Sequence, residues 1–325
     1  MWIPDVILLG PAGAKAYMYL SCLKRLFEEK MEKIEKIEKI EKMEKMEKME
    51  KIEKTEEHFL SNVKNWIGVS AGAALSLLIV SGYSIDEITN ICMEINLTDD
   101  IMSINIDEAR QKLGLIKNKT IEDKLKYYIS LKFGFIPNLK QLYSLSGIGL
   151  SMATFNLDKM RPEFLDKDSE PELCCVEAAM MSMAVPILMQ PRKYKGYSYI
   201  DGALGSPYPI SVFDHDDKKI LGLYISSEED CIRSDNNPAS FLYRLIHSSM
   251  KVLRDNEIKY ASKNVKHIVL KSAVKDTTGL TINTEMKQNM LNQGYSAADN
   301  FLKIVTNPEK YDISLKENEE IPFSN

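Results

Sequence analysis

The stretch Asn65-Trp66-Ile67-Gly68-Val69-Ser70-Ala71-Gly72 decides the fold, together with the strongly apolar run from Ala73 to Val80 that follows it. Its first residues predict a short buried strand, and the apolar run predicts a buried helix. The turn between them carries a Gly-x-Ser-x-Gly motif. A serine on a sharp strand-to-helix turn needs small neighbours, so that the backbone can approach a substrate at the helix N-terminus. Ser70 is therefore the candidate nucleophile, and a purely structural turn is the alternative.

An earlier part of the chain repeats this order of strand, turn and helix. Val6 to Leu9 is apolar throughout and predicts a buried strand, which runs into a turn from Gly10 to Gly13. The segment after this turn has helical spacing of its large apolar residues, which are Tyr17, Leu20, Leu23 and Phe27. Two units of strand, turn and helix are thus expected, one on each side of residues 28–57.

A serine nucleophile needs a base, which is usually a histidine. The chain has four histidines, none in a context that marks a catalytic role: His58, His215, His247 and His267. A carboxylate is the other choice, and Tyr199 to Ala203 reads as an apolar strand that ends in Asp201 on a turn of small residues. Aspartate before glycine is also a common turn pair. Asp201 is the candidate base, and an ordinary turn residue is the alternative.

Composition and charge exclude several classes of protein. The chain has 325 residues, 44% of them hydrophobic, which is typical of a globular protein and excludes a disordered one. Its 42 Lys and Arg against 47 Asp and Glu give a net charge of −5, so we expect no basic face for nucleic acid. The five cysteines have no Cys-x-x-Cys spacing, which disfavours a zinc site or a redox motif.

The same features bear on location. Unpaired cysteines favour a reducing cytoplasm, and the first residues lack the basic and apolar regions of a signal peptide. The longest apolar run, Ile67 to Val80, has 14 residues, which is short of the ~20 that span a bilayer. We therefore expect a cytoplasmic protein whose contact with membranes would be peripheral.

Residues 28–57 form a low-complexity insertion. From Glu29 to Thr55 the sequence is nine Glu-Lys-X triplets, in which X is Met or Ile until the last. A three-residue period falls short of the 3.6-residue helical turn, so the apolar positions spiral around a helix and form no coiled-coil seam. We expect an expanded repeat in a surface loop, since long surface insertions cost little loop entropy. An arm that binds an unknown protein partner is the alternative.

Taken together, the motifs resemble those of the patatin-like phospholipase family. Gly68 to Ala73 looks like the nucleophile elbow of that family, and Asp201-Gly202-Ala203 looks like its Asp-Gly-Ala/Gly motif. Between them, Ala179 to Pro186 is similar to the family's Ala-x-x-Ser-x-Ala-x-Pro. The motif glycines are Gly68, Gly72 and Gly202. The resemblance covers nearly the whole chain outside the insertion.

The resemblance implies a three-layer α/β fold, in which helices flank a mostly parallel central sheet. Residues 5–213 would form the patatin-like catalytic region, interrupted by the insertion at 28–57, and strands and helices in 214–325 would complete the same domain. It also implies a Ser–Asp dyad that needs no metal and no organic cofactor. Asp201 would accept the proton of Ser70, which would attack a lipid ester and form an acyl-enzyme.

The activity implied is that of a lipid acyl hydrolase of the phospholipase A or lysophospholipase type, with a lipid or phospholipid as substrate. The family binds the oxyanion through a glycine-rich loop after its first strand, and the matching residues here are Ala12, Gly13, Ala14 and Lys15. Pro11 and Ala12 stand where the family has glycines. A catalytically impaired protein that binds lipid or a protein partner is therefore one alternative, and a histidine-dependent hydrolase is another.

Two further patterns concern the surroundings of the site. The segment from Ser84 to Lys140 has helical periodicity, marked in its second half by Leu125, Tyr128, Ile129 and Leu131. If the resemblance holds, helices in this segment would cover the site and shape substrate entry. A group of methionines is expected to fill the core, with an acyl-chain lining as the alternative: Met180, Met181 and Met183.

Overall fold

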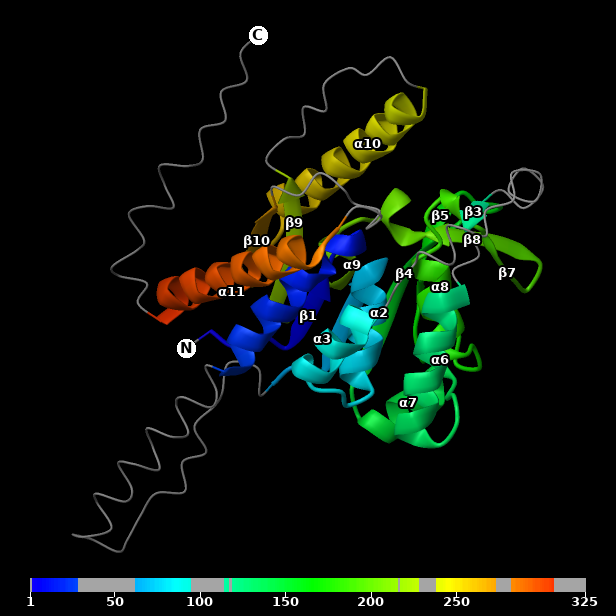
Figure 1. Cartoon of the computed structure of the whole chain (residues 1–325), viewed down its shortest axis with the longest axis horizontal. Helices are drawn as coiled ribbons and strands as arrows, with labels where there is room; N and C mark the ends of the chain where they lie inside the picture. Colours follow the sequence, from blue (N-terminus) through cyan, green and yellow to red (C-terminus); the bar gives the residue numbers. More distant parts are fainter. Residues whose placement is uncertain are drawn as a thin grey trace, which may run out of the picture.

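The computed structural model describes residues 2–28, 62–94, 114–116, 119–215, 217–227, 238–272 and 282–306. The low-complexity repeat lies outside these residues. The described chain forms a mixed α/β structure, in which a mostly parallel central sheet is flanked by helices (Figure 1). The predicted fold class is confirmed.

The central sheet has eight strands among the described residues, in the order β10, β9, β1, β2, β4, β8 and β7, with β5 paired to β4. They are β1 (Val6–Leu9), β2 (Asn65–Val69), β4 (Gly149–Asn156), β5 (Arg161–Leu165), β7 (Arg192–Tyr194), β8 (Tyr197–Asp201), β9 (Ile220–Ser227) and β10 (Val265–Ser272). The strands from β10 to β4 run parallel to one another, whereas β5, β7 and β8 run antiparallel to their neighbours. A separate parallel pair joins β3 (Gly114–Ile116) to β6 (Ile187–Met189).

The helices connect these strands and cover the sheet. Near the candidate site lie the 3₁₀ helix η1 (Gly13–Ala16), a helix over residues 17–28, α2 (Ala71–Val80), α8 (Cys175–Ser182) and the 3₁₀ helix η2 (Gly202–Leu204). The others are α3 (Ile85–Glu94), α6 (Lys119–Phe133), α7 (Leu139–Ser146), α9 (Ile210–Phe213), α10 (Pro238–Tyr260) and α11 (Thr284–Thr306). Both predicted units of strand, turn and helix are therefore present. None of the described helices is both long and apolar enough to cross a membrane.

Strand β1 shows how the sheet is buried on both faces. Its residues alternate in direction, as in any strand. Ile7 and Leu9 belong to the larger core cluster, which also contains residues of α2 and of the helix over residues 17–28. Val6 and Leu8 belong to a second cluster with Tyr208, which contacts residues of α9 and α10. A parallel strand covered on both sides is expected to be apolar throughout, which explains the sequence of β1.

The described part of the segment 84–140 contains α3, α6 and the start of α7, as its helical periodicity predicts. Leu125 and Ile129 are buried on α6, whereas Leu131 is 65% exposed. Leu131 lies two residues from Ile129, which places it on the opposite side of a helix with 3.6 residues per turn. The short strand β3 in this segment was not predicted. The three methionines of α8 and its end are buried in the core, as expected: Met180, Met181 and Met183.

Candidate active site

Ser70 occupies a strained turn between β2 and α2. Its backbone has φ of 57° and ψ of −128°, a region that residues other than glycine rarely adopt. Such strain costs about 1–3 kcal/mol and is retained at functional sites, where the surrounding structure enforces it. Ser70 is 6% exposed and occupies the N-cap position of α2. The turn therefore holds the serine at the N-terminal end of a helix, where the helix dipole favours negative charge.

The two motif glycines make this turn possible by close backbone contacts. A Cβ atom on Gly68 would overlap the backbone of Ala73, and a Cβ on Gly72 would overlap the carbonyl groups of Leu9 and Gly10. Gly72 thus allows the first turn of α2 to lie against the carboxyl end of β1. This contact places the segment after β1 beside Ser70.

Strand β4 brings Asp201 to Ser70 through its pairing register. Val69, at the end of β2, pairs with Ala153, and Asp201, at the end of β8, pairs with the next residue, Thr154. Because β5 pairs along the other edge of β4, β2 and β8 share one edge and their carboxyl ends meet there. The Ser70 hydroxyl lies close enough to the Asp201 carboxylate to lower its pKa. The two candidate residues, 131 positions apart in sequence, form one pair.

The environment of Asp201 adjusts its proton affinity. Asp201 is 2% exposed, and burial raises its pKa from 3.8 to about 7. The Ser70 hydroxyl and a hydrogen bond from the Ala203 N–H, at 2.8 Å, act in the opposite direction. A base with a pKa near the operating pH is the most effective general base. The carboxylate is therefore suited to accept a proton from Ser70 near neutral pH.

Comparisons with known proteins place this chain in a family. Residues 9–214, more than half of the chain, match the family model described as patatin-like phospholipase. The chain belongs to the patatin-like phospholipase family. An uncharacterised protein of Acanthamoeba polyphaga mimivirus is 27% identical over 235 residues, which cover 70% of this chain and 78% of the viral protein.

Two further relatives extend the comparison. A protein of Invertebrate iridescent virus 6, named "Probable lipid hydrolase", is 24% identical over 159 residues, which cover 47% of this chain and 54% of the viral protein. The crystal structure of VipD from Legionella pneumophila superposes with a TM-score of 0.56 at 16% identity, covering 92% of this chain and 67% of VipD. At this level of identity the structural match shows that the fold is shared.

Ser182 supports the candidate nucleophile, Ser70, and was not singled out from the sequence. The Ser70 N–H donates a hydrogen bond of 3.0 Å to the Ser182 hydroxyl, and Ser182 is fully buried. Ser182 is the last residue of α8, which Arg192 ties to α6 through hydrogen bonds to Glu177 and Glu122. The serine of the Ala-x-x-Ser-x-Ala-x-Pro stretch is Ser182, so the motif contained the signal. Its role became visible only from its position beside Ser70.

Replacing Ser182 by Ala is expected to lower both stability and activity. The variant would leave the buried N–H of Ser70 without its acceptor, which costs about 1–3 kcal/mol. We expect a lower melting temperature and a lower kcat, since the strained turn loses a restraint. Ser76→Ala is the matched control, because Ser76 is equally buried and its hydroxyl has no hydrogen-bond partner among the described residues. Equal melting temperatures and rates for the two variants would contradict the role of Ser182.

In the predicted oxyanion loop, one of the backbone N–H groups is already hydrogen-bonded within the loop. Gly13 has φ of 52° and begins η1, which contacts α2. The Lys15 N–H donates to the Ala12 carbonyl at 3.0 Å, so it is already used. The first N–H groups of a helix have no intrahelical acceptor. Of the four predicted donors, Gly13 and Ala14 are therefore the best suited to bind an oxyanion, with Ala12 at the N-cap position before them.

Two of the described histidines are exposed, and the third lies on the edge strand of the sheet. His267 is on β10, at the edge of the sheet, where it shares a 2.9 Å hydrogen bond with the Tyr208 hydroxyl. Burial lowers the pKa of His267 to about 4. His215 and His247 are exposed, whereas Ser70 and Asp201 are buried. His58 lies outside the described residues, and the described part of the chain contains no cluster of three or more residues that could hold a metal ion.

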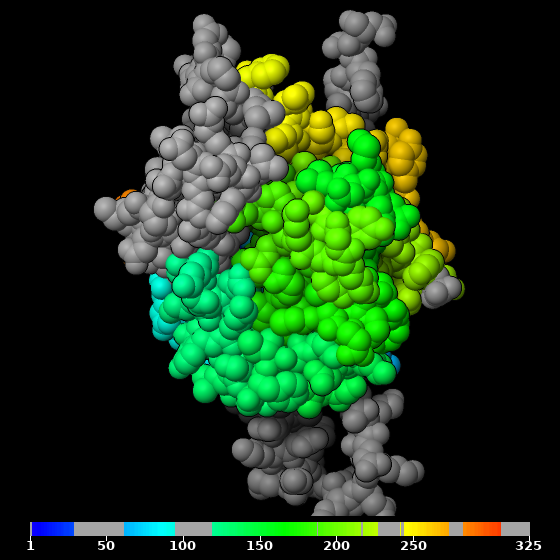
Figure 2. Space-filling model, turned by 90° about the vertical axis from the view of Figure 1, so that its right-hand side faces the viewer, coloured from blue at the N-terminus to red at the C-terminus, as the bar shows by residue number. Residues whose placement is uncertain are grey.

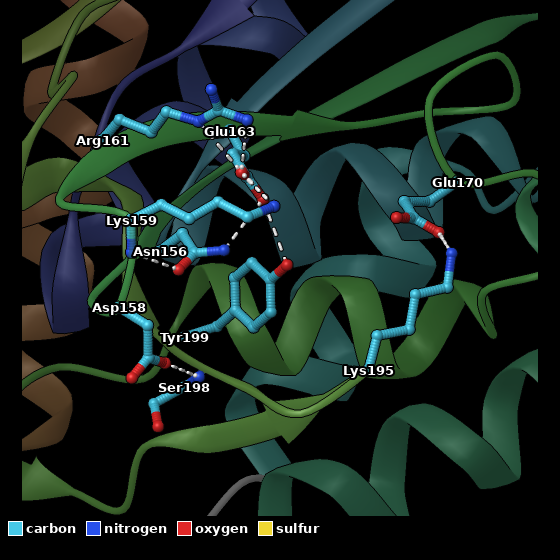
Figure 3. Close-up of polar contacts among 9 residues, drawn as sticks. All are labelled: Asn156, Asp158, Lys159, Arg161, Glu163, Glu170, Lys195, Ser198 and Tyr199. Carbon is cyan, nitrogen blue, oxygen red and sulfur yellow. Dashed lines mark hydrogen bonds and ion pairs between the residues drawn. The ribbon is translucent and has the colours of Figure 1, made fainter.

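A polar network braces the strand that carries Asp201 (Figure 3). The carboxylate of Glu163 on β5 accepts hydrogen bonds of 3.1 to 3.2 Å from Asn156, Lys159, Arg161 and Tyr199. Burial would raise the pKa of Glu163, but these hydrogen bonds lower it. Tyr199 lies on β8, two residues before Asp201, and Thr154 donates a buried hydrogen bond to the Ile200 carbonyl between them. The network therefore fixes β8 against β4 and limits the movement of Asp201.

Proposed function

We propose that this protein is a lipid acyl hydrolase of the phospholipase A or lysophospholipase type. The observation that carries the proposal is that Ser70, in a strained turn at the start of α2, lies beside the buried carboxylate of Asp201. Membership of the patatin-like phospholipase family supports a lipid ester as the substrate class. The relative from the iridescent virus, which is named as a probable lipid hydrolase, points in the same direction.

The proposed reaction uses Asp201 as general base and general acid in turn. Asp201 accepts the hydroxyl proton of Ser70, and the serine oxygen attacks the carbonyl carbon of the ester. The tetrahedral intermediate collapses, and protonated Asp201 gives its proton to the departing alcohol. Water then loses a proton to Asp201 and attacks the acyl-serine, which releases a fatty acid and restores the pair.

The negative charge that develops on the carbonyl oxygen needs hydrogen-bond donors. The N–H groups of Gly13 and Ala14 are the proposed donors, because η1 lies against the start of α2. The N-terminal end of α2 adds a partial positive charge beside Ser70. The Ser70 N–H does not contribute, since it is bonded to Ser182.

One observation favours a second candidate, a catalytically impaired protein that binds lipid or a protein partner. Pro11 has no N–H, and the N–H of Lys15 is bonded to Ala12. The loss of one oxyanion donor typically lowers kcat by about 10²–10³. The hydrolase remains the preferred reading, because an impaired protein does not need a buried base whose pKa lies near 7.

We also propose a cytoplasmic location with peripheral contact to membranes. The four cysteines of the described chain, Cys22, Cys92, Cys174 and Cys175, are free thiols, which fits a reducing compartment. The substrate class supplies the reason for contact with lipid surfaces.

The test of the proposed function is the release of fatty acid from phospholipid and lysophospholipid dispersions by the purified protein. Product analysis by mass spectrometry would identify the acyl position that is cut. Turnover that exceeds that of the Ser70→Ala variant supports the hydrolase. Lipid binding without turnover in either protein would favour the impaired alternative.

A further inference from the structure

Helix α10 carries apolar side chains on two opposite faces, and only one face is packed. The packed stripe has a spacing of four residues and consists of half-buried Ile246, Met250, Arg254 and Ile258. On the opposite side, Phe241 is 65% exposed, Leu245 is 54% exposed and Val252 is 60% exposed. With 3.6 residues per turn, these three side chains point in nearly one direction, away from Met250. We call Phe241, Leu245 and Val252, together with Arg244, the outer face of α10.

Helix α10, which carries the outer face, packs beside the strand ends that hold the candidate site. Met250 packs against Val69 and Ala203, which neighbour Ser70 and Asp201 in sequence. The residues that precede Met250 extend α10 by about 18 Å at 1.5 Å per residue. In Figure 1 this part of α10 projects beyond the sheet, and in Figure 2 α10 again lies at the outer end of the molecule. Phe241 and Leu245 therefore sit on a projection beside the site.

Charge distinguishes this half of α10 from the rest of an acidic protein. The chain has a net charge of −5, yet residues 238–254 contain Arg244, Lys251 and Arg254 and no Asp or Glu. The acidic residues of α10 follow this segment: Asp255 pairs with Lys251 and Arg254, and Glu257 accepts hydrogen bonds from Ser211. Arg244 lies three residues from Phe241 and next to Leu245, and a basic side chain beside large apolar ones fits a surface of anionic phospholipid headgroups and acyl chains.

We propose that the outer face of α10 is a docking surface for anionic phospholipid bilayers. Phe241 and Leu245 insert between the headgroups, and Arg244 contacts their phosphates. Met250 fixes α10 beside the Ser70 turn, and the outer face lies on the opposite side of the helix, so docking places the bilayer across α10 from the pair. The use of this surface in catalysis rests on the proposed function, whereas the binding itself does not.

Two exposed apolar residues on α6 provide a matched control for the loss of exposed apolar side chains. Tyr127 is 59% exposed and Leu131 is 65% exposed, values close to those of Phe241 and Leu245. They lie in the second half of α6, which leads through α7 to the starting end of β4, away from Ser70. Removal of the same apolar area from α6 should leave bilayer binding unchanged.

The test is vesicle flotation of the full chain in the Ser70→Ala background, so that hydrolysis does not alter the lipid. Vesicles of phosphatidylcholine with about 30% phosphatidylserine should bind the parent more tightly than pure phosphatidylcholine, and salt should weaken this binding. The double variant Phe241→Ser, Leu245→Ser should bind with an affinity that is lower by about tenfold or more. The double variant Tyr127→Ser, Leu131→Ser should bind like the parent.

Three results would overturn the docking proposal: no binding by the parent, equal binding by both double variants, or a dimer in gel filtration that only the α10 variant loses. The last result would assign the outer face to a second copy of the chain. The proposed function is tested separately, by hydrolysis of a monomeric soluble ester by proteins that retain Ser70. There the α10 variant should match the wild type, and an inactive wild type would contradict the hydrolase without affecting the binding result.

Discussion

Replacing Ser70 by Ala is expected to abolish ester hydrolysis, with a loss of about 10⁴-fold or more in kcat. The serine oxygen forms the covalent bond to the acyl group in the proposed reaction, whereas the neighbouring Ser182 hydroxyl is fully buried and accepts the hydrogen bond from the Ser70 N–H. Ser76, on the same helix, is buried and points its hydroxyl at no hydrogen-bond partner in the described chain. The measurement is fatty-acid release by wild type, Ser70→Ala and Ser76→Ala under identical conditions.

The structure also predicts what should not change in the Ser70 variant. Alanine keeps the strained φ of 57°, so the melting temperature should stay close to that of the wild type. Ser70→Gly should instead raise stability by about 1 kcal/mol or more, because glycine adopts positive φ without strain. Activity that persists in Ser70→Ala while Ser76→Ala is inactive would contradict the assignment of the nucleophile.

Replacing Asp201 by Asn is expected to reduce hydrolysis by about 10³-fold or more, because the amide cannot accept the serine proton. In the wild type, kcat/KM should rise with pH and level off above about 7, the pKa to which burial raises Asp201. The residual activity of the variant should lack this titration. A pH profile of both proteins on a soluble ester is the measurement. An unchanged profile in Asp201→Asn would exclude Asp201 as the base.

The same substitution should raise stability at neutral and alkaline pH. The pKa of Asp201 is about 7 in the folded protein and near 3.9 in an unfolded chain, so the folded state binds more protons between these values. Stability of the wild type therefore falls as pH rises from about 4 to about 7. Asn does not ionise and escapes this loss, which is of the order of a few kcal/mol. The melting temperature of Asp201→Asn should exceed that of the wild type at pH 8 and match it near pH 4.

The sequence predicted the parts of the site that depend on local pattern. The strand before Gly68, the apolar helix after Gly72 and the small-residue turn around Ser70 are all signalled within 16 residues of sequence, from Asn65 to Val80. Asp201 was found in the same way, at the end of an apolar strand. These signals are local because a sharp turn constrains the size of its immediate neighbours, as the overlap of a Gly72 Cβ with the carbonyl of Leu9 shows.

The remaining features depend on contacts between distant segments. The meeting of β2 and β8 on one edge of β4 follows from strand register, which no single segment encodes. Ser182 supports Ser70 across 112 residues, and Lys15 was proposed as an oxyanion donor although its N–H closes a turn on Ala12. The exposure of Leu131 and of the outer face of α10 also required the packed structure, since apolar periodicity alone does not reveal which faces find a partner.

The most direct test of the central claim is covalent labelling of the purified protein with a fluorophosphonate probe, which reports an activated serine without knowledge of the substrate. The wild type should be labelled, and mass spectrometry should place the adduct on Ser70. Labelling should disappear in Ser70→Ala and fall strongly in Asp201→Asn, while Ser76→Ala is labelled like the wild type. A folded wild type that is not labelled, or an adduct on another serine, would contradict the claim that Ser70 and Asp201 form a catalytic pair.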